Sequence, residues 1–199
     1  ANKKLLFDQF NLDIEKPLFV FIGRLVNEKA ADLLPQAIYD SIYHLEARMN
    51  FLILGSGESS VEWELENMKH QLEGYYNARI GYSEKLSHQM YAGADFLLMP
   101  SRVEPCGLNQ MYAMRYGTVP VVRNTGGLHD TVIDFGDPGG YGIRFNDATV
   151  WDITYSIHRA LEMYNQPKLL AKTLATIMEL DFSWETSTAK YIQLYESLK

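Results

Sequence analysis

Charged residues follow two apolar runs of the chain, at the points where predicted buried strands end. Arg24 and Lys29 come after the run 18–22, and Glu104 comes after the run 96–99. Two cations at a sheet edge, near the start of a helix, suit a diphosphate group. A carboxylate in such a loop can accept hydrogen bonds from sugar hydroxyls and can stabilise a positively charged transition state. From the residues alone, solvated surface charges are the simpler interpretation.

Glycine turns accompany these charged residues. Gly107 opens a predicted helix, and its first residues, Leu108 and Asn109, would direct free N–H groups toward an anion. Cys106 is interpreted as a small packing residue that lines the pocket, because no base that could activate a nucleophile is visible nearby. The turn 125–127, Thr-Gly-Gly, either closes over a sugar or phosphate or serves only as a structural turn.

One tyrosine is a candidate for contact with a nucleotide base. Tyr82 follows the short apolar run 78–80, and its ring offers a flat face for stacking. The chain has 13 tyrosines, so the residue type alone does not single it out. The segment 55–57, Gly-Ser-Gly, lacks the third spaced glycine of a dinucleotide fingerprint and predicts a tight turn.

The sequence predicts no metal site and no cofactor. The five histidines show no spacing typical of metal ligands. No Asp-x-Asp pair occurs in the chain. We therefore expect phosphate binding without a divalent metal.

Strands and helices alternate along most of the chain. Strands are predicted at 18–22, 51–54, 78–80, 96–99, 119–122 and 141–145. Helices are predicted at 3–10, 30–47, 58–71, 85–91, 107–115, 128–133, 150–164, 167–178 and 184–198. Within the second of these, Pro35 suggests that the helix proper begins near Leu34.

This alternation predicts an α/β fold with a doubly wound, mostly parallel six-stranded sheet, Rossmann-like, followed by a helical C-terminal tail. Right-handed crossovers place every strand-to-helix loop at one edge of such a sheet. Ligands bind at that carboxyl edge in open α/β sheets. The candidate residues should therefore lie near one another.

Composition narrows the class of protein. The length of 199 residues and the absence of a linker predict one domain. A net charge of −7 argues against a general surface for nucleic acid or an anionic membrane. The single cysteine excludes an internal disulfide and fits a reducing compartment. Without a signal peptide or a long apolar span, a cytoplasmic protein is expected.

Three segments resemble the C-terminal nucleotide-binding domain of glycogen and starch synthases, which are retaining glycosyltransferases of the two-domain GT-B architecture. They are GRLVNEKA at 23–30, IGYSEKLSHQMYAGAD at 80–95, and PSRVEPCGLNQMYAMRYGTVPVVRNTGGLHDTV at 100–132. The resemblance covers most of the chain. It implies that residues 1–199 form one donor-binding domain whose N-terminal acceptor domain is absent. The start Ala-Asn-Lys, without an initiator Met, agrees with a cut from a longer protein.

The resemblance assigns roles to the candidate residues. Arg24 and Lys29 would hold the diphosphate of a sugar nucleotide and neutralise the charge on the departing nucleotide. Tyr82 matches the position that stacks on adenine. Glu104, with Cys106 beside it, would contact the sugar and stabilise the transition state.

The residues at the predicted start of the helix, 107–109, match the family's motif except at Asn109. Gly107 and Leu108 would contact the diphosphate through the backbone, and Gly107 would also lie against the sugar. Asn109 stands where the family usually has Thr, and both have a short polar side chain. Tyr112 stands where the wider class of retaining GT-B enzymes has a second Glu, as is usual for glycogen synthases.

The resemblance implies the donor-binding half of a glycogen synthase. Such an enzyme moves glucose from ADP-glucose or UDP-glucose to the 4-OH of an α-1,4-glucan, with retention. Because the acceptor groups would lie on the missing N-terminal domain, the chain alone should bind nucleotide without turnover. The alternatives are another retaining GT-B transferase, such as a sucrose- or trehalose-forming enzyme, and a non-catalytic nucleotide-binding module. The sequence leaves open the choice between ADP-glucose and UDP-glucose.

Overall fold

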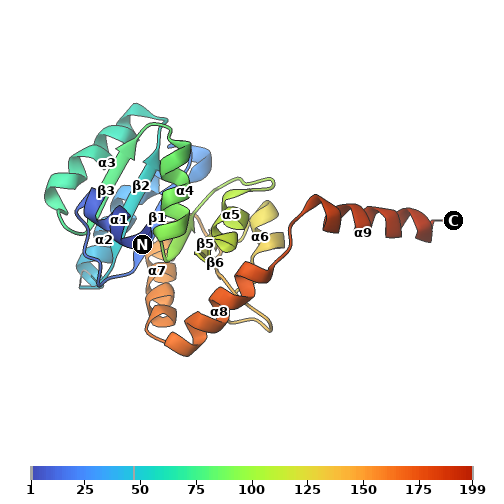
Figure 1. Cartoon of the computed structure of the whole chain (residues 1–199). Helices are drawn as coiled ribbons and strands as arrows, with labels where there is room; N and C mark the ends of the chain where they lie inside the picture. Colours follow the sequence, from blue (N-terminus) through green and yellow to red (C-terminus); the bar gives the residue numbers. More distant parts are fainter. Residues whose placement is uncertain (1, 47, 199) are drawn as a thin grey trace.

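The computed structural model describes residues 2–46 and 48–198, and its centre is a six-stranded sheet (Figure 1). All neighbouring strands are parallel, in the order β3-β2-β1-β4-β5-β6. The strands are β1 (Leu18–Ile22), β2 (Asn50–Gly55), β3 (Tyr76–Ile80), β4 (Phe96–Met99), β5 (Val119–Arg123) and β6 (Ile143–Phe145). The predicted doubly wound parallel sheet is confirmed. The strand order reverses between β1 and β4, which makes these neighbours the topological switch point.

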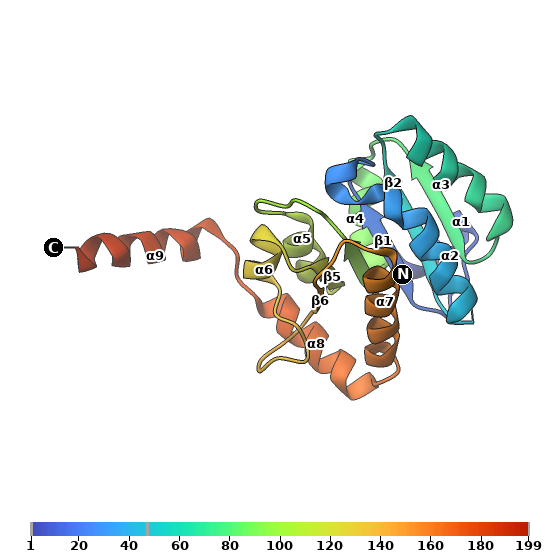
Figure 2. The same cartoon turned by 180° about the vertical axis from the view of Figure 1, so that it is seen from behind.

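Helices cover both faces of the sheet (Figures 1 and 2). One face is covered by α2 (Leu34–His44), α3 (Ser59–Gln71) and α7 (Val150–Tyr164). The other is covered by α1 (Asn2–Phe10), α4 (Glu84–Gly93), α5 (Asn109–Arg115) and α6 (Gly126–Thr131). Helix α8 (Pro167–Glu179) packs against α5 and α7.

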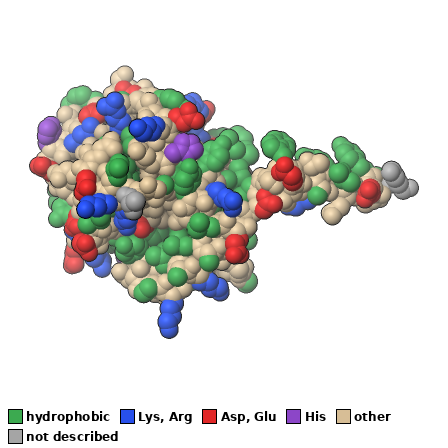
Figure 3. All heavy atoms as spheres, in the orientation of Figure 1, with side chains coloured by type: hydrophobic (Ala, Val, Ile, Leu, Met, Phe, Trp, Pro, Cys, Tyr) green, Lys and Arg blue, Asp and Glu red, His purple; other side chains and the backbone are tan. Residues whose placement is uncertain are grey.

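The last helix, α9 (Trp184–Ser197), stands apart from the body of the protein. No residue of α9 is buried, and Figure 3 shows hydrophobic side chains along it. The predicted helical tail is therefore confirmed as a helix that packs on nothing within the described part of the chain. None of the described helices combines the length and the apolar character needed to cross a membrane.

Phenylalanines of the three central strands pack on the α2 face of the sheet. The Phe19 ring lies 4.7 Å from that of Phe96 and 5.5 Å from that of Phe51, centroid to centroid. All three are essentially inaccessible to solvent. Burying one such side chain contributes about 1.5–3 kcal/mol. Their neighbours Leu18 and Val20 are buried on the opposite face, because both faces of a parallel sheet are covered.

The segment 30–47 is only partly helical, and the expectation that the helix proper begins near Leu34 is confirmed. Two 3-10 turns, η1 (Asn27–Lys29) and η2 (Ala31–Leu33), come first, and α2 begins at Leu34 with Pro35 in its first turn. The reason is local, since Ala30 between the two turns has a left-handed φ of 52° that a helix cannot contain. Helix α2 ends at His44, and position 47 lies outside the described residues.

The glycine turn after β2 is explained by a close approach of two loops. A Cβ atom on Gly55 would lie 2.0 Å from the carbonyl oxygen of Gly23. Beside it, the amide of Leu25 donates to the carbonyl of Ser56 at 2.8 Å, and the amide of Glu58 donates to the carbonyl of Leu25 at 2.8 Å. The predicted tight turn therefore also joins the ends of β1 and β2.

We expect Gly55→Ala to lower the free energy of unfolding by about 2–3 kcal/mol, because the added methyl group meets backbone that cannot rotate away. Gly23→Ala is the matched control, since its Cβ would meet only the Phe21 ring at 3.7 Å. We expect that control to stay within about 0.5 kcal/mol. Urea unfolding measures both, and equal losses would contradict the close-approach argument.

Candidate active site

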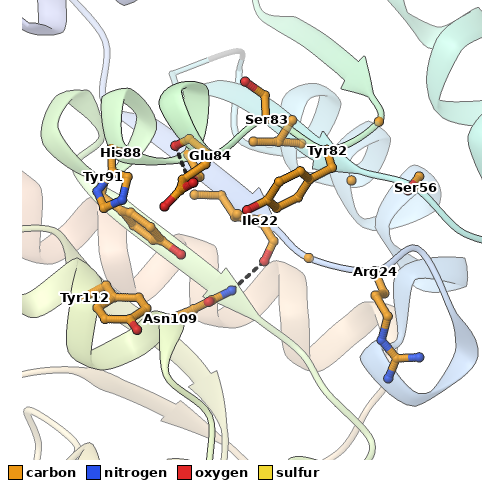
Figure 4. A pocket seen from close by; sticks show the side chains of 15 residues that line it. Ile22, Arg24, Ser56, Tyr82, Ser83, Glu84, His88, Tyr91, Asn109 and Tyr112 are labelled. Carbon is orange, nitrogen blue, oxygen red and sulfur yellow. Dashed lines mark hydrogen bonds between the residues drawn. The ribbon is translucent and has the colours of Figure 1, made fainter.

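A cavity of about 570 Å³ opens at the carboxyl edge of the sheet (Figure 4). Its walls come from the ends of β1 and β2, the segment 81–83, and helices α4 and α5. Three of the predicted site residues line it, namely Arg24, Tyr82 and Asn109. The position agrees with the expectation that ligands bind beyond the carboxyl ends of the strands.

Helix α4 supplies one wall of the cavity. Ser83 caps its N-terminus by accepting a hydrogen bond from the amide of Leu86 at 3.3 Å. Glu84, His88 and Tyr91, spaced at four and three residues, then line the cavity from one side of the helix. Sequence reasoning did not single out these three residues. Their helical spacing within the segment 80–95 was the signal that could have found them.

Aromatic rings form the corner between α4 and α5. Tyr91 lies 6.2 Å from Tyr112 and 6.1 Å from Tyr116, centroid to centroid. The Tyr116 hydroxyl and His88 Nδ1 are hydrogen-bonded at 2.9 Å. Burial raises the pKa of Tyr91, so its phenol stays neutral. Across the cavity, Tyr82 is 87% exposed, so its ring is open to a ligand (Figure 4).

Asn109 joins α5 to the end of β1. Its side-chain Nδ2 donates to the carbonyl oxygen of Ile22 at 2.6 Å. The sequence did not predict this bond, which occupies part of the side chain that had been assigned to phosphate. Gly107 has a left-handed φ of 72°, and the helix begins at Asn109 rather than at Gly107. The side chain of Leu108 between them is about half exposed.

Lys29 and Glu104 meet in an ion pair. Lys29 Nζ lies 2.5 Å from Glu104 Oε2, and Ser101 Oγ donates to the same oxygen at 3.0 Å. Glu104 is 7% exposed, which makes it one of the few buried charged side chains of the described chain. A carboxylate removed from water in this way needs its cation and its hydrogen bond.

The loop that carries Glu104 is held in place by two arginines. Arg102 forms a bidentate pair with Asp32, with N···O distances of 2.6 and 2.9 Å. This hydrogen-bonded guanidinium holds the pKa of Asp32 below its ordinary value. Arg123 donates to the carbonyls of Ser101 and Arg102, each at 2.7 Å. The loop after β4 is thereby fixed to η2 on one side and to β5 on the other.

The turn 125–127 packs against the same loop. The amide of Gly127 donates to the carbonyl of Glu104 at 3.1 Å, and a Cβ atom on Gly127 would lie 2.0 Å from the carbonyl oxygen of Cys106. This contact supports the structural interpretation of the turn. Cys106 itself is exposed.

Arg24 makes only a surface pair. Its Nη2 lies 2.9 Å from Glu28 Oε2, and both side chains are about two-thirds exposed. An exposed pair of this kind contributes little to stability, so Arg24 is free to exchange partners. Within residues 2–46 and 48–198, no group of three or more histidine, cysteine, aspartate or glutamate side chains is placed to hold a metal ion.

The Rossmann-like sheet, with a cavity at its switch point, is one half of a GT-B glycosyltransferase fold. Residues 2–177 match the model of the family described as glycosyl transferases group 1, and the chain belongs to this family. Its relatives include a glycogen synthase of Flavobacterium johnsoniae, 54% identical over 194 residues. Another, from Thioalkalivibrio sulfidiphilus, is 43% identical over 188 residues. The predicted resemblance is confirmed.

Among solved structures, the catalytic domain of starch synthase IV from Arabidopsis thaliana, bound to ADP and acarbose, is 36% identical with a TM-score of 0.87. The match covers 98% of this chain and 42% of that one. The two glycogen synthases are matched over 98% and 92% of this chain, and over 41% and 38% of their own lengths. The chain thus spans about two fifths of the proteins it matches.

We expect Lys29→Met to lower the free energy of unfolding by about 3 kcal/mol, because it leaves the buried Glu104 carboxylate without its cation. Adding Glu104→Gln to this variant should restore part of the loss. Arg24→Met is the matched control and should stay within about 0.5 kcal/mol, since its pair is exposed. Urea unfolding of the three variants measures the effect. If the free energy of unfolding of Lys29→Met changed no more than that of Arg24→Met, the Lys29–Glu104 pair would make no net contribution to stability.

Proposed function

We propose that this chain is the donor-binding domain of a glycogen synthase. The whole enzyme would transfer glucose from a nucleoside diphosphate glucose to the non-reducing 4-OH of an α-1,4-glucan, with retention of configuration. The observation that carries the proposal is the meeting of Lys29 and Glu104 at 2.5 Å, at the same sheet edge as the 570 Å³ cavity. The glycogen synthases among its relatives support the choice of reaction.

The cavity would hold the nucleotide. Tyr82 offers an exposed ring for the base. Arg24 and Lys29 would bind the diphosphate with charge-assisted hydrogen bonds. The backbone of Gly107 and Leu108 would add N–H donors, and no divalent metal would be required. The ADP bound to starch synthase IV supports a nucleoside diphosphate as the ligand.

Glu104 would act on the sugar. When the bond between glucose and the diphosphate breaks, positive charge develops on the sugar ring, and a nearby carboxylate stabilises it. Without a donor, Lys29 neutralises Glu104. When the diphosphate binds, it competes for Lys29, and the charge of Glu104 is then available to the sugar. Lys29 in turn would stabilise the negative charge on the departing diphosphate.

The acceptor glucan and the remaining catalytic groups would belong to the part of the protein outside this chain. The isolated chain would therefore bind nucleotide without turnover. The single cysteine supports a reducing, cytoplasmic location. Either ADP-glucose or UDP-glucose satisfies the contacts described above.

Two alternatives are less well supported. A sucrose- or trehalose-forming transferase is disfavoured because Tyr112 lines the cavity where the wider class has a second Glu. A non-catalytic nucleotide-binding module would not need a buried carboxylate beside Lys29, and burying such a charge is costly.

We expect this chain to bind ADP or UDP with EDTA present. The affinity should be low, because this chain would supply only one side of the proposed cleft. Arg24→Ala should weaken ADP binding by about 1.5–3 kcal/mol, because a charge-assisted hydrogen bond is lost. Adenosine binding should be unchanged. Isothermal titration calorimetry measures both.

The structure offers a matched control for Arg24. Glu28→Gln removes its competing partner without altering the arginine, so ADP should bind at least as tightly as to the unaltered chain. Equal losses for ADP and adenosine in Arg24→Ala would show a perturbed fold instead. No heat with either diphosphate at millimolar concentration would overturn the proposed donor site.

Glu104→Gln is best tested in the full-length two-domain enzyme. It keeps the shape of the side chain but removes the charge, so it should lower kcat much more than it raises the donor KM. We expect a loss of about 10²–10³-fold in kcat. ADP affinity should not fall, because Arg24 and Lys29 are unaltered and Lys29 loses a competing partner, and a thermal melt checks that the loop is intact. A near-normal kcat would remove Glu104 from the mechanism.

A further inference from the structure

Three aromatic rings lie in a row along the outer side of α7. Trp151, Tyr155 and His158 are spaced at four and three residues, on the side of the helix opposite its buried residues. The Trp151 ring lies 6.4 Å from that of Tyr155, with 7° between their planes. The Tyr155 ring lies 6.4 Å from that of His158, with 13° between the planes. The three flat faces therefore share one orientation.

These rings are not required by the fold. Trp151 is 74% exposed and Tyr155 is 54% exposed. Helix α7 is anchored by its other side, where Ile153 and Ile157 are fully buried. Its N-terminus is capped by Thr149, which accepts a hydrogen bond from the amide of Asp152. The row of rings is thus presented on a rigid helix.

The polar groups of these rings are also free. Within the described part of the chain, the side chains of Trp151, Tyr155 and His158 form no hydrogen bond with another residue. Each ring therefore offers an apolar face and an unused N–H, O–H or ring nitrogen at its edge. Glu162, one turn further along the same side, is exposed and can accept hydrogen bonds.

This combination favours a sugar over a protein partner. A glucose ring has an apolar C–H face and a rim of hydroxyls, so it can stack on a flat ring while bonding to polar groups at the edge. The exposed side of α9 differs, since it includes aliphatic Ile192 and Leu194, which offer no flat face and no polar edge. The α7 row has no aliphatic member.

The row of rings on α7 lies outside the cavity, but hydrogen bonds connect the segment before α7 to the loop that carries Glu104. Helix α7 follows β6, so Trp151 in its first turn lies toward the carboxyl edge of the sheet, whereas the cavity is lined from β1, β2, α4 and α5. Arg123 donates to the carbonyl of Asn146, just before α7, and to that of Ser101, just before the loop of Glu104. The row and the cavity thus belong to one domain, on helices that cover opposite faces of the sheet.

We propose that Trp151, Tyr155 and His158 form a second carbohydrate site that binds an α-glucan chain away from the active site. The identity of the polymer rests on the proposed function, whose acceptor is an α-1,4-glucan. Holding a polymer at a second site raises the concentration of its chain ends near the active site without any change in the catalytic groups.

The test is native gel electrophoresis of this chain in gels that contain increasing glycogen. We expect glycogen to retard the unaltered chain, and the double variant Trp151→Ala/Tyr155→Ala to need about tenfold more glycogen for the same retardation. Trp63→Ala is the matched control, because Trp63 is 70% exposed on α3 and has no parallel ring beside it in the described chain. That variant should behave as the unaltered chain does. Both variants change exposed side chains, and circular dichroism checks that they fold.

Three outcomes would overturn the inference. The unaltered chain could migrate independently of glycogen, or Trp63→Ala could lose retardation as strongly as the double variant. The double variant could instead abolish self-association in sedimentation while glycogen retardation stays unchanged, which would make the row a protein interface. Because no nucleotide is used, the result is separate from the ADP titration. Glycogen retardation without ADP binding would leave this site standing and overturn only the donor site.

Discussion

Lys29 and Glu104 are 75 residues apart in the chain, and their 2.5 Å contact depends on the order of the strands. Lys29 follows β1 and Glu104 follows β4, and these two strands are neighbours at the switch point of the sheet. Because a buried carboxylate is costly without a cation, the pair links the stability of the domain to the position of its proposed catalytic group. The cavity, the loops and the glycine contacts all lie around this junction.

Several contacts hold the loop after β4, which carries Glu104, against the segment after β1, which carries Lys29. The bidentate Arg102–Asp32 pair ties the loop after β4 to η2, and Arg123 ties it to the other side of the sheet. Gly127 allows the next turn to press against the same backbone. A rigid loop presents its charge without reorganisation, which is the condition for electrostatic stabilisation of a transition state. Lys29, which is 23% exposed, is better placed to exchange its partner than Glu104, which is held from two sides.

The sequence predicted elements well where a single local signal dominated. The strand 96–99 and the helix 150–164 have the predicted bounds, because an apolar run ends at Pro100 in one case and a capped amphipathic pattern begins in the other. In the segment 30–47, Pro35 correctly indicated that the helix proper begins near Leu34. The left-handed conformation of Ala30 was not predicted, because it has no signature in the residue type. The role of Asn109 in phosphate binding was predicted only because its side chain is short and polar like that of Thr. Its hydrogen bond to the carbonyl of Ile22 was therefore not predicted.

The sequence by itself determined the alternation of strands and helices and the glycine turns, because apolar runs and turn chemistry are local properties of the chain. It named Arg24, Lys29 and Glu104 as candidate site residues through their motifs. Only the tertiary structure decided which of these residues meet. It joined Lys29 to Glu104 but left Arg24 on the surface, and it placed His88 and Tyr91 in the cavity wall. The reason is physical: contacts between distant segments follow from strand order and helix packing, which depend on how all the apolar surfaces are buried together.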